Sequence, residues 1–227
     1  MSLQRVVSIA FCHAAAVLPL VALAASVSQH EFADVTRLAP NTEHGIALFQ
    51  TCAKCHGPDG GGSRAIGTPE IAGQHFRVLA KQLVDYQQDK RYDIRMEQIA
   101  KQHDLQGAQA IADVATYVSR LEWKTAGGIG DGELVAHGQE VYLQSCRSCH
   151  GPEGEGDATA FVPRVAGQHY GYVLREMHDA VEGRRPNFSI KHIRLLQKLD
   201  HDDFVGVADF LSRMGTSQVR SQIRATH

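Results

Sequence analysis

Cys52-Ala53-Lys54-Cys55-His56 has a second copy in this chain of 227 residues, Cys146-Arg147-Ser148-Cys149-His150. Both copies read Cys-x-x-Cys-His, and both continue into Gly-Pro. Together they hold four of the five cysteines, and an offset of 94 residues superposes one on the other. Two copies of this pattern indicate that the chain repeats a larger structural unit.

The repeat extends well beyond the cysteines. At the same offset of 94, Pro69 matches Pro163, and Ala72-Gly73-Gln74-His75 matches Ala166-Gly167-Gln168-His169. A Gly-rich segment, 125–132, separates the copies and is predicted to be a linker. We therefore predict one domain over residues 25–125 and a second domain over residues 126–227.

The Cys-x-x-Cys-His spacing suits the covalent attachment of a c-type haem. Two thiols three positions apart can each add to one vinyl group of the macrocycle, and the adjacent histidine is then placed to ligate the iron. A thioredoxin-like dithiol needs a βαβ context that this sequence lacks. A zinc site needs a further Cys or His pair at finger spacing, which is also missing. The sequence therefore predicts two c-type haems with these attachment and iron-ligand residues: Cys52, Cys55 and His56 for the first, and Cys146, Cys149 and His150 for the second.

Helical periodicity dominates both halves of the chain. Apolar residues recur at i, i+3, i+4 and i+7 after each Gly-Gln-His and again near the end of each half. The four runs are Phe76, Leu79, Ala80, Leu83; Tyr170, Val173, Leu174, Met177; Ile111, Val114, Ala115, Val118; and Phe204, Val207, Ala208, Leu211. No segment shows sustained strand alternation, so the predicted fold class is all-α.

A shorter helix is predicted ahead of each cysteine pair. It begins near His44-Gly45 in the first copy and near His137-Gly138 in the second. The spacing from Gly45 to Cys52 is one residue shorter than the spacing from Gly138 to Cys146. We expect the first of these helices to enter its haem site with altered geometry.

Residues 1–24 are predicted to be a signal peptide that is cleaved after export to the periplasm. Arg5 precedes an apolar run that ends on Ala22-Leu23-Ala24. A retained membrane anchor is the alternative, but the run is short and interrupted. The chain carries 23 Lys and Arg against 25 Asp and Glu. It therefore lacks the basic surface that nucleic-acid binding needs.

Each Cys-x-x-Cys-His-Gly is followed by a Pro-x-x-Ala-Gly-Gln segment, at 69–74 and at 163–168. With these motifs the whole mature chain resembles the dihaem cytochrome c4 family, which has two class I cytochrome c domains in tandem. The resemblance implies that the carbonyls of Pro69 and Pro163 accept a hydrogen bond from Nδ1 of His56 and of His150, respectively. It also implies two haems that face each other across the domain interface.

The resemblance points to Met96 as the sixth ligand of the first iron. The segment from Arg91 to Ala100 is similar to the family's distal methionine segment, which lies ahead of the closing helix. A core methionine that fills a gap is the alternative.

No methionine remains to serve the second iron. At the matching offsets, Met177 falls on Leu83 and Met214 falls on Leu121. His192 stands three residues before Leu195-Leu196, as Met96 stands three residues before Ile99-Ala100. We predict that His150 and His192 together ligate the second iron. His178, His201 and an open or water-bound iron remain as alternatives.

Two further pairs of residues have competing interpretations. Lys90-Arg91 and Arg184-Arg185 come shortly before the predicted distal ligands, and they suit either the neutralisation of haem propionates or a solvated basic turn. His75 and His169 each precede an amphipathic helix, where we expect a capping or interface residue rather than an iron ligand.

Two six-coordinate irons leave no position for a substrate, so the expected chemistry is outer-sphere electron transfer. A bis-histidine iron has a lower reduction potential than a His/Met iron, so electrons are expected to run from the second haem to the first. The resemblance implies periplasmic or membrane-bound redox partners, such as a terminal oxidase or a dehydrogenase. A dihaem redox enzyme, or the electron-transfer subunit of one, is the alternative, because the distal side of the second haem is unusual.

Overall fold

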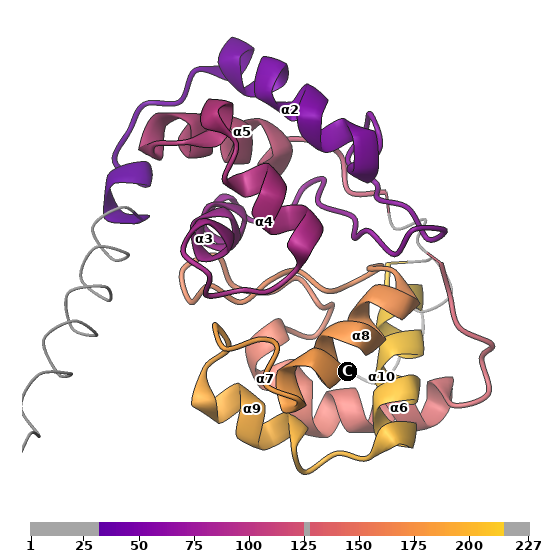
Figure 1. Cartoon of the computed structure of the whole chain (residues 1–227). Helices are drawn as coiled ribbons and strands as arrows, with labels where there is room; N and C mark the ends of the chain where they lie inside the picture. Colours follow the sequence, from indigo (N-terminus) through magenta and orange to yellow (C-terminus); the bar gives the residue numbers. More distant parts are fainter. Residues whose placement is uncertain (1–31, 125–127, 216–227) are drawn as a thin grey trace, which may run out of the picture.

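The computed structural model describes residues 32–124 and 128–215 and arranges them as two helical domains, one above the other in Figure 1. We call residues 32–124 domain 1 and residues 128–215 domain 2. The predicted signal peptide, residues 1–24, lies outside the described residues. Among the residues that are described, no helix is long and apolar enough to cross a membrane.

The two domains repeat one series of helices. In domain 1 these are α2 (Thr42–His56), α3 (Phe76–Gln87), α4 (Ile94–Ala100) and α5 (Ala108–Ser119), with a 3-10 turn at His103–Leu105. In domain 2 they are α6 (Val135–Val141), the π-helical turn η2 (Tyr142–Cys146), α7 (Arg147–His150), α8 (Tyr170–Val181), α9 (Ile190–Leu196) and α10 (His201–Arg213). Residues 32–124 and 128–215 contain isolated bridges but no strand, as the all-α prediction requires.

Polar side chains start several of these helices. Asn41 accepts a hydrogen bond from the backbone of His44 at the start of α2. Asp200 and Asp203 form a capping box at the start of α10, where each side chain accepts from the other residue's backbone N–H. Such caps satisfy the free N–H groups of the first turn, so they place the start of each helix.

Glycines let the first and last helices of each domain cross closely. A Cβ atom at Gly45 of α2 would collide with the backbone carbonyl of Asp113 in α5. A Cβ atom at Gly138 of α6 would collide with the backbone of Gly206 in α10. Only glycine fits at these two positions, so the close packing of α2 on α5 and of α6 on α10 depends on Gly45 and Gly138.

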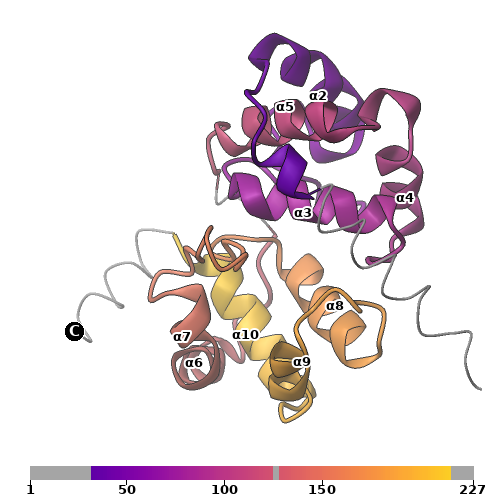
Figure 2. The same cartoon turned by 90° about the vertical axis from the view of Figure 1, so that its left-hand side faces the viewer.

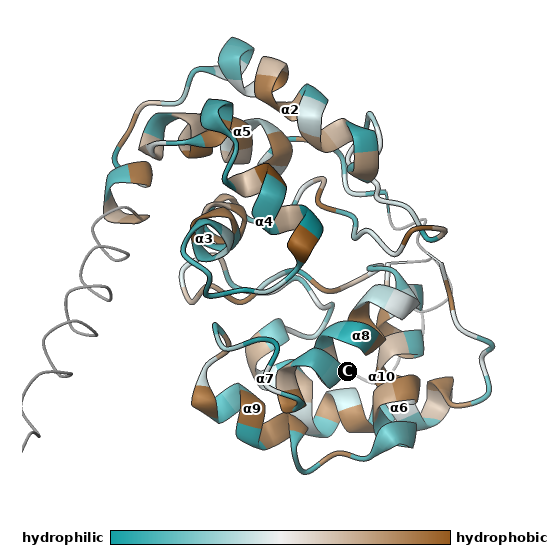
Figure 3. Cartoon of the chain, in the orientation of Figure 1, coloured by the Kyte–Doolittle hydropathy of each residue, from teal (hydrophilic) through white to brown (hydrophobic). Residues whose placement is uncertain are grey.

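The apolar runs predicted from the sequence form the cores. Ile111, Ala115 and Val118 of α5 are fully buried, as are Phe204, Val207 and Ala208 of α10. Figure 3 shows the apolar residues gathered where the helices of one domain face each other. Met177 and Met214 belong to the core of domain 2.

The one-residue difference in spacing before the cysteines changes the second helix, not the first. α2 is a regular α-helix up to His56, so the expectation of altered geometry in the first helix was wrong. In domain 2 the extra residue is accommodated in the π-helical turn between α6 and α7. A π-turn adds one residue per turn, so it keeps the flanking segments in register. Phe49 and Tyr142 both remain fully buried ahead of their cysteines.

The domains meet along a polar interface. In Figures 1 and 2, α3 lies on the side of domain 1 that faces domain 2, and α8 lies on the opposing side of domain 2. Arg91, which follows α3, donates to the hydroxyl of Tyr172 in α8 at 2.8 Å, and Arg175 of α8 donates to the carbonyl of Gly67 at 3.0 Å. These hydrogen bonds attach α8 of domain 2 to two loops of domain 1, the one after α3 and the one that contains Gly67.

Candidate functional site

Each cysteine pair lies at the end of the helix that packs on the last helix of its domain. All four thiols are free of disulfide bonds. Cys52 and Cys146 are partly buried against the cores, and burial raises the pKa of each thiol to about 11. Cys55 and Cys149 are exposed. Each domain therefore offers two free thiols at the c-type spacing, one partly buried against its core and one exposed, for attachment to a haem.

His56 and His150 have matching hydrogen bonds. Nδ1 of His56 lies 2.9 Å from the carbonyl oxygen of Pro69, and Nδ1 of His150 lies 3.2 Å from that of Pro163. Burial lowers the pKa of both imidazoles, which favours the neutral form. Since Nδ1 donates its proton to a carbonyl, Nε2 keeps the lone pair that a metal needs. The contacts that the resemblance implied are therefore present.

Met96 and His192 occupy the same position in matching helices. Each is the third residue of a seven-residue helix, Met96 in α4 and His192 in α9. Each helix is capped at its N-terminus by a side chain that accepts from this residue. The backbone N–H of Met96 donates to Asp93 at 3.3 Å, and that of His192 donates to Ser189 at 3.2 Å. The match supports the pairing of these residues, although the spacing from Arg185 to His192 is two residues longer than that from Arg91 to Met96.

The ring of His192 faces that of His150. Their centroids are 6.1 Å apart and the ring planes are tilted by 53°. A metal–imidazole bond is about 2 Å long, so one atom bound between two imidazoles holds their centroids roughly 6 Å apart. Phe188 stacks on His192 at 4.7 Å and limits its rotation. Burial, then the neighbouring His150 and Arg185, lower the pKa of His192 to about 4. The residues thus suit an iron held between two neutral imidazoles.

The rival histidines contact each other instead. The ring of His178 lies 5.5 Å from that of His201 and 5.1 Å from that of Phe204. These contacts belong to the junction of α8 with α10, and they include neither His150 nor His192. His178 and His201 are thus less suited to hold the second iron.

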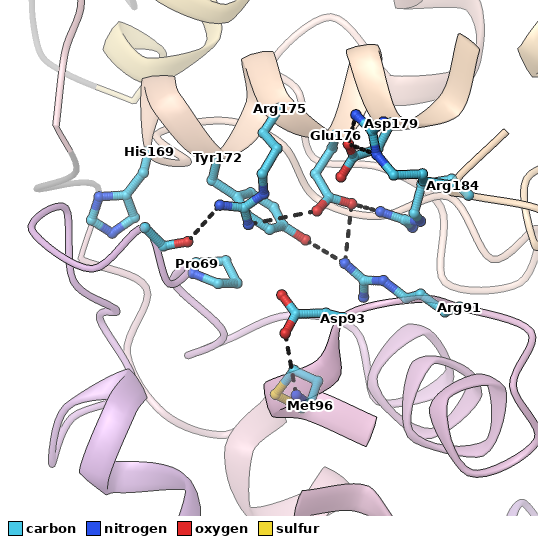
Figure 4. A network of polar contacts seen from close by, with 12 residues as sticks. Pro69, Arg91, Asp93, Met96, His169, Tyr172, Arg175, Glu176, Asp179 and Arg184 are labelled. Carbon is cyan, nitrogen blue, oxygen red and sulfur yellow. Dashed lines mark hydrogen bonds and ion pairs between the residues drawn. The ribbon is translucent and has the colours of Figure 1, made fainter. Parts of the chain in front are cut away.

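Two buried arginines lie at the interface between the domains, and Figure 4 labels one of them, Arg91. Arg91 donates to Tyr172 and to Glu176, and Arg185 forms an ion pair with the same Glu176. Both side chains are buried, so neither belongs to a solvated turn. Nε of Arg91 has no hydrogen-bond partner among the described residues. Burial and the charge of Arg91 lower the pKa of Arg185 to about 9. The two cations share the carboxylate of Glu176, and haem propionates are suited to supply further negative charge.

Sequence reasoning missed most of this interface. Tyr172 and Glu176 lie in α8, where the amphipathic pattern gave no sign of a contact with domain 1. Arg184 pairs with Asp179 and Glu182 on the surface, while its neighbour Arg185 is buried. His75 and His169 start α3 and α8 and also reach across the interface, as their predicted roles allow.

Comparisons with known proteins agree with this geometry. The family model of Cytochrome c matches residues 42–122 and again residues 135–214. A cytochrome c4 of Pseudomonas aeruginosa is 33% identical over 177 residues, which cover 74% of this chain and 85% of that protein. The crystal structure of reduced recombinant cytochrome c4 from Pseudomonas stutzeri superposes with a TM-score of 0.69 at 28% identity, over 78% of this chain and 100% of that one.

A third relative has a more specific name. The thiosulfate dehydrogenase electron acceptor of Stutzerimonas stutzeri is 28% identical over 176 residues, which cover 74% of this chain and 80% of that protein. The fold and the two motifs define a c-type cytochrome with two tandem domains. The chain belongs to the dihaem cytochrome c4 family. It binds two c-type haems and transfers electrons to and from other redox proteins, and it is a carrier rather than an enzyme.

Proposed function

We propose that this cytochrome carries electrons in one direction, from domain 2 to domain 1, between redox proteins of the periplasm. The observation that carries the proposal is the exchange of Met96 for His192 at one position of two matching helices. It gives the domains different sixth ligands on similar scaffolds.

The geometry of each domain supports the ligand assignment that we propose. We assign His56 and Met96 to domain 1, and His150 and His192 to domain 2. His150 and His192 face each other, and Phe188 holds the ring of His192 in place. On the domain 1 side, Asp93 and Arg95 of the α4 segment are close enough to His56 to act on its pKa. This supports Met96, which lies in the same segment, as the sixth ligand of that iron.

Each haem, when bound, supplies an iron that accepts and returns one electron. A neutral thioether favours ferrous iron more than an imidazole does, so Met96 gives domain 1 the higher potential. When a haem is bound, Arg91 and Arg185 would pair with its propionates between the domains, where both side chains are shielded from solvent. Both act close to the ligands, because the charge of Arg91 affects the pKa of His56 and the charge of Arg185 affects that of His192.

A periplasmic dehydrogenase is the proposed electron donor. Similarity to an electron acceptor of thiosulfate dehydrogenase supports this class of donor. The acceptor is a redox protein of higher potential, and a terminal oxidase fits that description. The predicted signal peptide, residues 1–24, supports export.

A redox titration of the holoprotein, followed by absorption, tests the proposal. We expect two separated potentials in the wild type. His192→Ala should convert only the lower-potential haem from low-spin to high-spin, and the matched variant Met96→Ala should remove the weak long-wavelength band of ferric Met-ligated haem. Two equal potentials, or a low-spin second haem that survives His192→Ala, would show that another residue holds that iron. Survival of the long-wavelength band would exclude Met96.

A further inference from the structure

Two glutamine side chains cross the domain interface in opposite directions. Gln168 of domain 2 binds the backbone of Glu70 in domain 1, with Nε2 donating to the carbonyl at 2.9 Å and Oε1 accepting from the N–H at 3.0 Å. Gln74 of domain 1 binds the backbone of Arg164 in domain 2 in the same way, with both distances at 2.9 Å. The repeat offset of 94 relates Gln74 to Gln168 and Glu70 to Arg164, so the two domains make equivalent contacts with each other.

The backbone groups that these glutamines bind are part of the histidine sites. The peptide group between Pro69 and Glu70 has two polar ends. Its carbonyl, that of Pro69, accepts from Nδ1 of His56 at 2.9 Å, and its N–H, that of Glu70, donates to Gln168. One planar peptide unit therefore connects the imidazole of domain 1 to an amide of domain 2.

A matching series of hydrogen bonds runs from His150 of domain 2 to Gln74 of domain 1. Nδ1 of His150 lies 3.2 Å from the carbonyl oxygen of Pro163, and the N–H of the same peptide group, that of Arg164, donates to Gln74. Both glutamines are buried, at 5% exposure for Gln168 and 8% for Gln74. Each Oε1 also accepts from the N–H of the following histidine, which fixes the orientation of the amide.

Hydrogen bonds in such a chain polarise one another. A peptide N–H that donates makes its own carbonyl a stronger acceptor, and the low dielectric of a buried interface strengthens the effect. A stronger acceptor at Nδ1 raises the basicity of the imidazole as a metal ligand. A more basic ligand favours ferric iron and so lowers the reduction potential.

We propose that each of these glutamines tunes the reduction potential of the haem in the opposite domain. Gln168 is a positioning residue for His56, and Gln74 is a positioning residue for His150. The docking of the domains thereby sets both potentials, because neither chain of hydrogen bonds closes within one domain. This inference rests on the proposal that His56 and His150 ligate the irons.

The test is a redox titration of Gln168→Met and Gln74→Met holoproteins. Methionine keeps the length of the side chain and removes both hydrogen bonds. We expect Gln168→Met to raise only the potential of the domain 1 haem, with a roughly threefold change in the ratio of ferrous to ferric iron, about 28 mV. Gln74→Met should raise only the potential of the domain 2 haem. Gln168→Asn, whose shorter amide does not reach Glu70, gives the same test if the methionine variant does not fold.

A control separates polarisation from a looser interface. Nε2 of His169 donates to the carbonyl of Gly61 across the same interface at 2.9 Å but does not touch the Pro69–Glu70 peptide. His169→Phe should therefore leave both potentials unchanged. A proton NMR spectrum of the reduced protein should also show the Nδ1–H resonance of His56 shifted in Gln168→Met and unshifted in His169→Phe.

Several results would overturn the inference. They are no shift, equal shifts at both haems, a shift in the glutamine's own domain, or the same response in His169→Phe. Equal potentials in the wild type, by contrast, would overturn the assignment of Met96 and His192 while the crossed shifts remained measurable. The two proposals thus fail in distinguishable ways.

Discussion

The two domains keep the same scaffold and differ where each approaches its iron. Two pairs of matching helices have equal lengths, with 12 residues in α3 and α8 and seven in α4 and α9. One difference is the extra residue before Cys146, and another is that His192 stands where domain 1 has Met96. The first difference changes the backbone and preserves the placement of the cysteines, whereas the second preserves the backbone and changes the ligand.

The extra residue before Cys146 shows how a helix accommodates an insertion next to a Cys-x-x-Cys-His motif. Gly138 and Tyr142 pack on α10 as Gly45 and Phe49 pack on α5, so both anchors upstream of the cysteines are kept. The π-turn restricts the change to Tyr142–Cys146. Domain 1 lacks the extra residue, and α2 is accordingly a regular α-helix throughout.

Deleting one residue at matching positions tests this difference and should have the largest effect. Gln50 and Gln144 are both exposed, and each stands two residues before the first cysteine of its pair. Deletion of Gln50 rotates the upstream part of α2 by about 100° relative to the cysteines. It should remove Phe49 from the core and cost roughly 3–5 kcal/mol. Deletion of Gln144 should instead convert the π-turn to α-helix and cost less than about 1 kcal/mol.

Urea unfolding followed by circular dichroism measures both costs. Gln50→Ala and Gln144→Ala keep the residue count and serve as controls, each expected within about 0.5 kcal/mol of the wild type. Equal losses in the two deletion variants would mean that the π-turn does not accommodate the insertion.

Making the two sixth ligands alike should remove the functional difference. We expect His192→Met to raise the potential of the domain 2 haem by on the order of 0.1 V, within the roughly 0.8 V range that axial ligands cover. The two potentials should then approach each other, because both irons would have a thioether ligand. A redox titration followed by absorption measures the gap.

His178→Gln is the matched control for this exchange. His178 contacts His201 and Phe204, so its replacement should leave the gap unchanged. A gap that persists in His192→Met but closes in His178→Gln would reassign the ligand.

Local patterns predicted the scaffold, but not the contacts between the domains. The i, i+3, i+4, i+7 runs predicted α3, α5, α8 and α10, because a helix buries one face whatever lies opposite. The bond from His56 to Pro69 followed from the resemblance, since both residues lie in one short segment. The burial of Arg91 and Arg185 depends on which surfaces dock, and the local sequence does not record this. The spacing before the cysteines revealed an inserted residue but not which helix changes.

The caps of α4 and α9 should give the smallest difference between the domains. Asp93 accepts from the N–H groups of Arg95 and Met96 and also pairs with the Arg95 side chain, which with those N–H bonds lowers the pKa of its carboxyl. Within the part of the chain that the structure describes, the neutral hydroxyl of Ser189 accepts only from the N–H of His192. The helix that presents His192 is therefore held less firmly at its start than the helix that presents Met96.

Loss of the weaker cap should make the release of His192 faster. Ser189→Ala removes one cap bond at a cost of about 1 kcal/mol, and local fraying of α9 becomes roughly fivefold more frequent. Cyanide binds ferric haem only after the sixth ligand leaves, so the rate of cyanide binding at domain 2 should rise about fivefold while the rate at domain 1 stays the same. Ser189→Thr keeps the hydroxyl and should bind cyanide at the wild-type rate. An unchanged rate in Ser189→Ala would mean that Phe188, stacked on the ring, holds His192 whether or not the helix is capped.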